Sequence, residues 1–266
     1  MKLALDEHAG LDSPLHRWAA PYKIVGLGLL MLAFASIRDL RLLLPMLSIA
    51  GLVYIASRLP ARVLLTRLRY PGLFLVSVIV ALPLLSGETV LWQWGWLTLR
   101  QEGVQAMGLI VGRFLSILTL SVVLLGTTPF VTLVRAFRSL GLPAILADML
   151  LLTYRYLFDL ADTLAQMQQA MRLRGFGRRQ RPARVKFSLW RTLNRLAALA
   201  GTLLVRSYEQ SERVYKAMQL RGYGARLGKG RSDRPQGTAF DWWGVVIALI
   251  SALSLVIAEA LLNWQR

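Results

Sequence analysis

The chain has 266 residues, of which 55% are hydrophobic, and its mean hydropathy of +0.48 excludes an ordinary soluble enzyme, since soluble domains are roughly 45–50% apolar. The formal charge of +18 suits nucleic acid, anionic lipid or an acidic protein as partner, and the position of that charge decides among them. The absence of Cys excludes disulfides and thiolate chemistry, and only His8 and His16 could offer imidazole, so we expect no metal site and no cofactor.

Five apolar segments are predicted to cross a membrane as helices. In chain order they are Ile24–Ile37, Leu42–Ser57, Pro71–Ser86, Gly103–Gly126 and Trp242–Leu262. The last segment has 21 residues and, at about 1.5 Å per residue, matches a hydrocarbon core of about 30 Å. The first three are shorter and require local thinning of the bilayer or snorkelling arginines. The fourth contains Arg113, which we expect to pair within the protein or to snorkel.

The distribution of basic residues predicts the orientation of these spans. The predicted loop Arg58–Tyr70 has four arginines and no acid, and residues 127–240 hold 20 of the 32 basic residues but only 6 of the 14 acids. Basic segments stay on the cytoplasmic side, so five spans place the N-terminus inside and the C-terminus outside a bacterial inner membrane. The loop Gly87–Glu102 then lies outside, with Trp92, Trp94 and Trp96 as interfacial anchors.

Between the last two spans, two long amphipathic helices are predicted. The first runs from Pro143 to about Arg174 without an interior glycine or proline, and the second from about Lys186 to Arg221, on the order of 54 Å. Both carry charges in their apolar stretches, so we interpret them as helices at or below the membrane. The chain therefore divides into a membrane domain (1–126), a cytoplasmic helical region (127–240) and a last span (241–266). The fold class is an all-α polytopic membrane protein.

A repeat marks the ends of these two helices. The segment Ala170–Gly177 (AMRLRGFG) recurs 47 residues later as Ala217–Gly224 (AMQLRGYG). Each copy ends in an apolar residue, an arginine, a helix-ending glycine and an aromatic ring. The arginine could present its donor fork to a carboxylate while the apolar side chains fill a groove in a partner, and two matching tips suit a dimeric partner. The alternative is a pair of ordinary glycine-capped helices.

The paired Leu-Arg-Gly endings resemble the transmembrane T component of energy-coupling factor (ECF) transporters. The stretch from Leu11 to Arg17, followed by Lys23, resembles the CbiQ-type cobalt/nickel permeases of that family. The resemblance implies a non-catalytic coupling subunit, two ABC-type ATPase subunits and a separate substrate-binding membrane subunit of the CbiM/CbiN kind. It also assigns ATPase coupling to six residues of the tips, which are Leu173, Arg174, Gly175, Leu220, Arg221 and Gly222.

Other functions are compatible with parts of the sequence. Within the family, the substrate could be biotin or another vitamin instead of cobalt or nickel. A basic membrane-bound protein that binds nucleic acid or lipid through Arg178–Lys186 is a second class, although this stretch lacks the interleaved aromatics that stack on bases. A membrane enzyme is a third, against which stands the lack of an intramembrane cluster of carboxylates or histidines. No Walker A sequence occurs, so we expect ATP hydrolysis to come from a partner.

Overall fold

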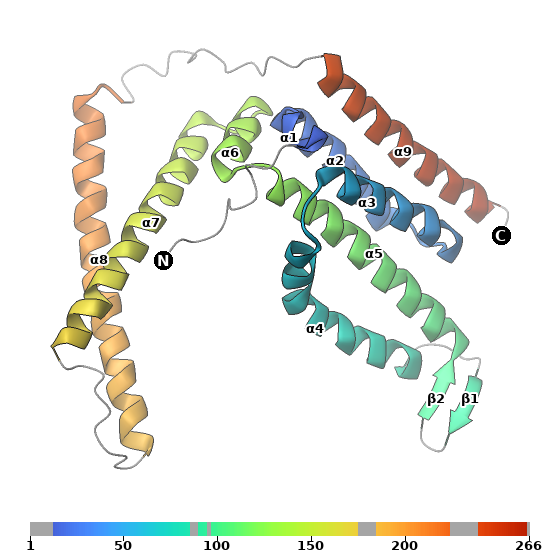
Figure 1. The fold of residues 1–266 in the computed structure, drawn as a ribbon, viewed down its shortest axis with the longest axis horizontal. Helices are drawn as coiled ribbons and strands as arrows, with labels where there is room; N and C mark the ends of the chain where they lie inside the picture. The colour runs from blue at the N-terminus through green and yellow to red at the C-terminus, as the bar shows by residue number, and fades with distance from the viewer. Residues whose placement is uncertain (1–12, 86–89, 95–96, 175–184, 224–238, 265–266) are drawn as a thin grey trace. The chain divides into compact units, whose positions relative to one another are not determined.

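The computed structural model describes residues 13–85, 90–94, 97–174, 185–223 and 239–264. This part of the chain is helical apart from one hairpin (Figure 1). The helices are α1 (Pro14–Arg17), α2 (Ala20–Ser36), the 3-10 turn η1 (Leu40–Leu42), α3 (Leu43–Ser57), α4 (Ala61–Leu85), α5 (Gln101–Gly126), α6 (Phe130–Ser139), α7 (Ala144–Leu173), α8 (Val185–Leu220) and α9 (Ala239–Trp264). The predicted all-α class is confirmed.

The helices form two compact units. The membrane unit contains α1 to α6, the hairpin and α9, and the arm unit contains α7 and α8. Packing thus places α6 beside α2 in the membrane unit, although its residues belong to the region 127–240 of the sequence.

Three helical stretches in the described residues are long and apolar enough to cross a membrane. They are Leu40–Ser57, Gln101–Gly126 and Asp241–Leu262, and α2 is a shorter apolar helix. The three stretches match the second, fourth and fifth predicted spans, and α2 covers most of the first. Their outward side chains include many exposed leucines and isoleucines, which is the surface that a lipid environment favours.

The segment predicted as a loop between the second and third spans is mostly helical, which corrects that prediction. Only Arg58–Pro60 lie outside helices there, because α4 begins at Ala61 and continues to Leu85. Pro71 lies inside α4 and cannot donate a bond to the carbonyl of Arg67, and the helix bends along its length (Figure 1). The predicted span Pro71–Ser86 is the second part of this helix, except that Ser86 lies outside the described residues.

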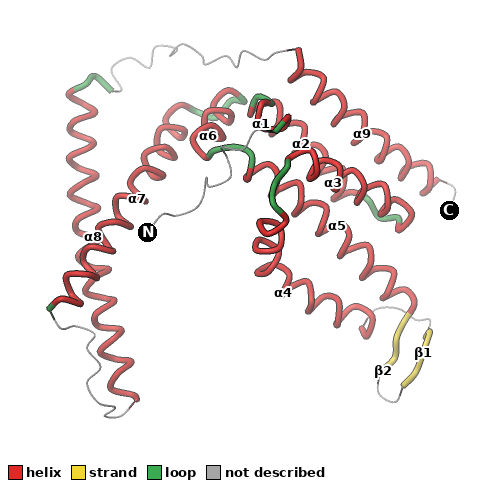
Figure 2. The backbone as a smooth tube through the Cα atoms, viewed as in Figure 1, coloured by secondary structure: helices red, strands yellow, loops and turns green. Residues whose placement is uncertain are grey.

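A short antiparallel hairpin replaces the predicted loop after α4. Strand β1 (Val90–Trp94) pairs with β2 (Leu97–Arg100), with Trp92 opposite Leu99 and a register shift between Val90 and Trp92 (Figure 2). Val, Thr and Trp, which occur in these strands, favour a pleated backbone, so the signal was present in the sequence. The anchoring role of the three tryptophans stays a prediction, and Trp96 lies outside the described residues.

Small residues allow the helices of the membrane unit to approach one another. A Cβ added at Gly112 would lie 2.7 Å from Leu43 Cδ1, so α3 and α5 meet where α5 has no side chain. Trp18 fills the corresponding position between α2 and α9, beside Gly26 and Gly244. Close backbone approach at glycine is a common basis of helix packing in lipid.

Buried polar groups bring three helix ends together in this unit. The Lys23 ammonium of α2 is 1% exposed and donates to Thr127 Oγ1 at 3.0 Å and Thr128 Oγ1 at 3.2 Å, just beyond α5. Asp241 Oδ1 accepts from the Ala19 amide at 2.7 Å, which joins the start of α9 to the start of α2. The end of α5 and the starts of α2 and α9 therefore lie on one side of the unit.

The arginine within the fourth span has a structural partner. Arg113 donates from its Nη2 atom to the carbonyl of Ile37, which follows the end of α2. Glu259 of α9 accepts from the amide of the next residue, Arg38, at 2.7 Å. The Arg113 guanidinium thus satisfies a carbonyl that the end of α2 leaves without a helical partner, and the predicted pairing of Arg113 within the protein is confirmed.

Candidate functional site: the two arm tips

The two predicted amphipathic helices are present with nearly the predicted bounds. Helix α7 begins after Pro143, whose missing N–H is tolerated at a helix start, and ends at Leu173. Helix α8 runs for 36 residues from Val185 to Leu220.

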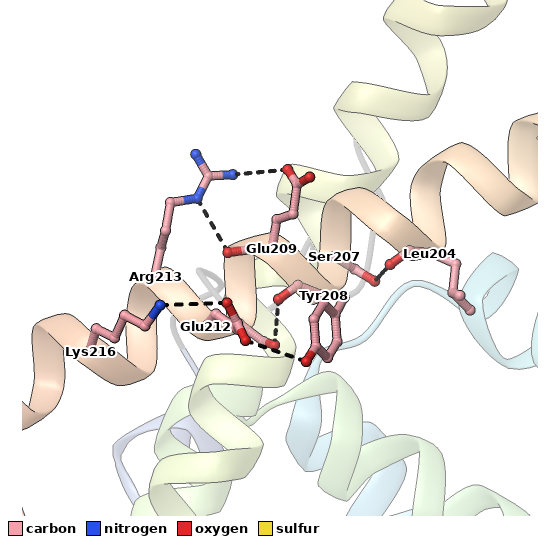
Figure 3. A network of polar contacts seen from close by, with 8 residues as sticks. Leu204, Ser207, Tyr208, Glu209, Glu212, Arg213 and Lys216 are labelled. Atoms are coloured by element: carbon pink, nitrogen blue, oxygen red, sulfur yellow. Dashed lines mark hydrogen bonds and ion pairs between the residues drawn. The ribbon is translucent and has the colours of Figure 1, made fainter.

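Helix α8 is stabilised along its exposed surface by contacts between successive turns (Figure 3). Arg213 Nη2 lies 3.9 Å from Glu209 Oε2, and Lys216 Nζ lies 3.6 Å from Glu212 Oε2. The Tyr208 hydroxyl donates to Glu212 Oε1 at 3.3 Å. Pairs at this spacing favour helix in water, where little packing supports it. We therefore interpret this part of α8 as an arm that is helical through its own local contacts.

The second tip ends α8 with a defined backbone motif. The amide of Tyr223 donates to the carbonyl of Met218 at 3.0 Å, and the amide of Gly222 donates to that of Gln219 at 2.9 Å. Gly222 has φ +76°, the left-handed conformation that glycine adopts at little cost. These two bonds define a Schellman motif and confirm the predicted end of the helix at Gly222.

The first tip ends α7 in a similar position of the repeat. The Arg174 amide donates to the carbonyl of Ala170 at 3.1 Å, and the equivalent Arg221 amide donates to that of Ala217 at 3.2 Å. The predicted end at Gly175 lies outside the described residues. Within the described part, the two copies place an arginine directly after the last helical leucine.

Both tips present an apolar side chain beside an exposed arginine. Leu173 is 82% exposed and Leu220 is 90% exposed, the highest values among the described leucines. Neither the Arg174 nor the Arg221 guanidinium has a hydrogen bond or ion pair to another described residue. Such an apolar side chain next to a cationic donor fork is typical of a surface that a partner covers.

The two tips lie at opposite ends of α7. The Tyr223 hydroxyl donates to Asp148 Oδ2 at 2.9 Å, which fixes the end of α8 beside the first turns of α7. The first tip lies 26 residues further along α7, a helical distance of about 39 Å. Figure 1 shows the two helices crossing between these ends. The arm unit therefore holds two similar tips far apart on one pair of helices.

The contact of Tyr223 with Asp148 was not predicted from the sequence. The repeat suggested that the methionine and the aromatic ring of each copy would face a partner, but in the second copy Met218 and Tyr223 line a groove between α7 and α8. This groove has a volume of about 800 Å³ and includes Asp159 and Arg206. Leu220 and Arg221 of this tip do not line the groove, and both are exposed to solvent. Residues 75 apart in sequence leave no local signal of their pairing.

No group of three His, Cys, Asp or Glu side chains that could hold a metal ion occurs among the residues that the structure describes. His16 Nδ1 lies 2.7 Å from Ser13 Oγ, a local contact at the start of α1. His8 lies outside the described residues.

Comparison with known proteins identifies the family. A family model described as CbiQ, cobalt transport protein, matches residues 12–230. The chain belongs to the CbiQ family. Its relatives include the energy-coupling factor transporter transmembrane protein EcfT of Limosilactobacillus fermentum, 25% identical over 266 residues that cover 95% of this chain and 96% of the relative. EcfT of Brevibacillus brevis is 26% identical over 73% of this chain and 71% of its own length.

A further relative matches about half of the chain. The uncharacterized protein MJ1089 of Methanocaldococcus jannaschii is 32% identical over 127 residues, which cover 48% of this chain and 44% of that protein. The resemblance that the repeat predicted is thus confirmed at the level of the family. This CbiQ-family chain is a multi-pass membrane protein of a transporter family.

Proposed function

We propose that this chain is the coupling subunit of an ECF importer, which transmits the movement of two ATPase subunits to a substrate-binding membrane subunit. The observation that carries the proposal is the pair of exposed Leu-Arg tips at opposite ends of α7. Two similar ATPases present two similar grooves, and two similar tips about 39 Å apart along α7 suit such a pair.

Each tip has the chemistry of an anchor. Arg174 and Arg221 can each give two parallel hydrogen bonds to a carboxylate at the rim of an ATPase groove. Leu173 and Leu220 then bury apolar surface in that groove. Gly222, at φ +76°, lets the chain turn away after the second tip, and a supporting role for Gly175 at the first tip is part of the proposal. The pattern is helix-in-groove recognition at a helix end.

The crossing of α7 and α8 offers a route for force. When ATP binding brings the two grooves together, the tips follow, and the angle between the two helices changes. The groove between the helices contains both apolar and charged side chains, and it offers a surface on which the substrate-binding subunit packs. A change of angle would reshape this surface.

We further propose that the membrane unit lies with the end of α5 and the starts of α2 and α9 in the cytoplasm. In support, the segment 58–70 with its four arginines follows the end of α3, and that end lies beside the end of α5. The N-terminus is then cytoplasmic, and the C-terminus lies outside.

We propose cobalt or nickel as the substrate of this importer. The description of the family as cobalt transport proteins supports a metal ion. An importer of biotin or another vitamin is the alternative, which is favoured by relatives that carry the general name EcfT without a metal. Uptake of labelled cobalt and nickel by the reconstituted complex distinguishes the two.

Charge reversal at both tips tests the docking. In the variant with Arg174→Glu and Arg221→Glu, capture of the ATPase pair in detergent should fall by at least about tenfold, because each change removes a charge-assisted contact and adds repulsion. The protein should still insert into the membrane, since both side chains lie at exposed helix ends.

A matched control has the same change of charge on the same two helices. Arg172→Glu with Lys216→Glu alters exposed residues near the tips but outside the Leu-Arg pairs. This control should capture the ATPases nearly as well as the natural chain. Equal capture by the tip variant and the control would rule out docking through the tips.

A further inference from the structure

A cluster of exposed arginines lies at the corner between α3 and α4. Arg58, Arg62, Arg67 and Arg69 fall within a 13-residue segment, 58–70, that has no acid. All four side chains are exposed, and none of their guanidinium groups has a hydrogen bond or ion pair to another described residue. The segment therefore concentrates positive charge that this part of the chain does not neutralise.

The first turns of α4 combine exposed arginines with an exposed leucine. Arg62 and Arg69 are seven residues apart and share one face of the helix with Leu65, which is 64% exposed. Val63 and Leu68 on other faces are partly buried. A leucine between two outward arginines fits the boundary between headgroups and acyl chains, where arginine stems lie along apolar surface and their charged ends stay in water.

The corner between α3 and α4 lies beside the end of the candidate span α5. Arg58 closes α3 in the left-handed conformation (φ 52°), and the next residue, Leu59, is buried. A Cβ added at Gly126 would lie 3.1 Å from Leu59 Cδ1, so the corner contacts the last residue of α5. Since α5 is a candidate span that ends at Gly126, the arginines begin at the level where the hydrocarbon core ends.

We propose that this segment binds the phosphate groups of anionic phospholipids and holds the start of α4 on the membrane surface. A basic side chain near an anionic bilayer is attracted to it, and the planar guanidinium fork matches phosphate oxygens in pairs. The exposed Leu65 and the adjoining span favour a lipid surface over a soluble polyanion. The inference does not depend on the docking of ATPases at the tips.

The full-length protein in bilayers of phosphatidylcholine with about 20% phosphatidylglycerol tests this proposal. Spin-labelled lipids of each kind report, through the motionally restricted fraction, which lipid the protein surface prefers. The natural chain should prefer phosphatidylglycerol. In the variant Arg62→Gln, Arg67→Gln, Arg69→Gln this preference should fall by at least about fivefold, whereas replacement of the same three residues by Lys should keep most of it.

A control removes three exposed arginines of the arm unit instead, through Arg155→Gln, Arg206→Gln and Arg213→Gln. This control has the same loss of net charge and should keep the preference. The proposal is overturned if the natural chain shows no preference for phosphatidylglycerol, or if the α4 variant keeps it. Equal losses in the α4 variant and the control would also overturn it, because they would reflect net charge alone.

Discussion

Two glycines, one inside α8 and one just beyond its end, show how the same residue type has opposite effects at different positions. Gly222 adopts φ +76° and ends the helix, so its lack of a side chain is needed for the backbone bonds of the second tip. Gly201 lies inside the helix, and a Cβ added there would meet nothing within 4 Å. At Gly201 the backbone is helical, and glycine only weakens the helix.

Substitution of these glycines by alanine should therefore change stability in opposite directions. Gly222→Ala should destabilise the end of α8 by about 1 kcal/mol, because alanine is strained at positive φ. Gly201→Ala should stabilise the middle of the helix by about 0.5–1 kcal/mol. Hydrogen exchange of the α8 amides measures both effects, with faster exchange near residue 222 in the first variant and slower exchange near residue 201 in the second. A change of the same sign in both would contradict the assigned conformations.

At the scale of elements, the hydrogen bond between Tyr223 and Asp148 connects the end of α8 to the start of α7. Along the rest of their crossing, the groove separates parts of the two helices. The tie therefore limits how far the second tip can move relative to α7.

Loss of the Tyr223 hydroxyl should loosen the arm unit. In Tyr223→Phe the ring remains but the bond to Asp148 is lost, so spin labels at Arg172 and Gln219, next to the two tips, should show a broader distribution of distances. Tyr208→Phe is the matched control, because the Tyr208 hydroxyl bonds Glu212 within the same helix and cannot connect two helices. An unchanged distribution in Tyr223→Phe, or an equal broadening in the control, would contradict this role.

Local pattern predicted the elements whose causes are local. The ends of α7 and α8 followed from Pro143 and Gly222, and the spans followed from runs of apolar residues. The prediction of a loop at Arg58–Tyr70 was wrong. Four arginines and the following Pro71 suggested a loop, but a helix tolerates exposed arginines and accommodates a proline with a bend. The contacts of Tyr223 and Lys23 with distant residues depend on tertiary packing, which periodicity does not encode.

At the scale of the whole molecule, α2 and α9 join the early and late parts of the chain within the membrane unit. Trp18 packs between Gly26 of α2 and Gly244 of α9, and its indole Nε1 donates to the Asp241 carbonyl at 3.1 Å. A Cβ at Gly244 would lie only 2.8 Å from Trp18 ring atoms. The ring and the glycine therefore form one close contact.

Gly244→Ala should weaken this contact. The added methyl group must displace the Trp18 ring, so the variant should lose about 1–3 kcal/mol of stability and unfold at a lower temperature in detergent. Gly28→Ala in the same helix pair should not lower the unfolding temperature, since a Cβ there meets nothing within 4 Å. Equal unfolding temperatures for Gly244→Ala and the natural chain would show that Trp18 can shift without cost.

The pairing of α2 with α9 also sets an order for biosynthesis. The ribosome delivers α2 before α7 and α8, but α9, which packs on α2, emerges only after both of those helices have been made. In the interval the apolar side of α2 lacks the cover of α9. Completion of the last helix is thus the step that closes the membrane unit, and a ribosome that stalls within the arms leaves that unit open to quality-control proteases.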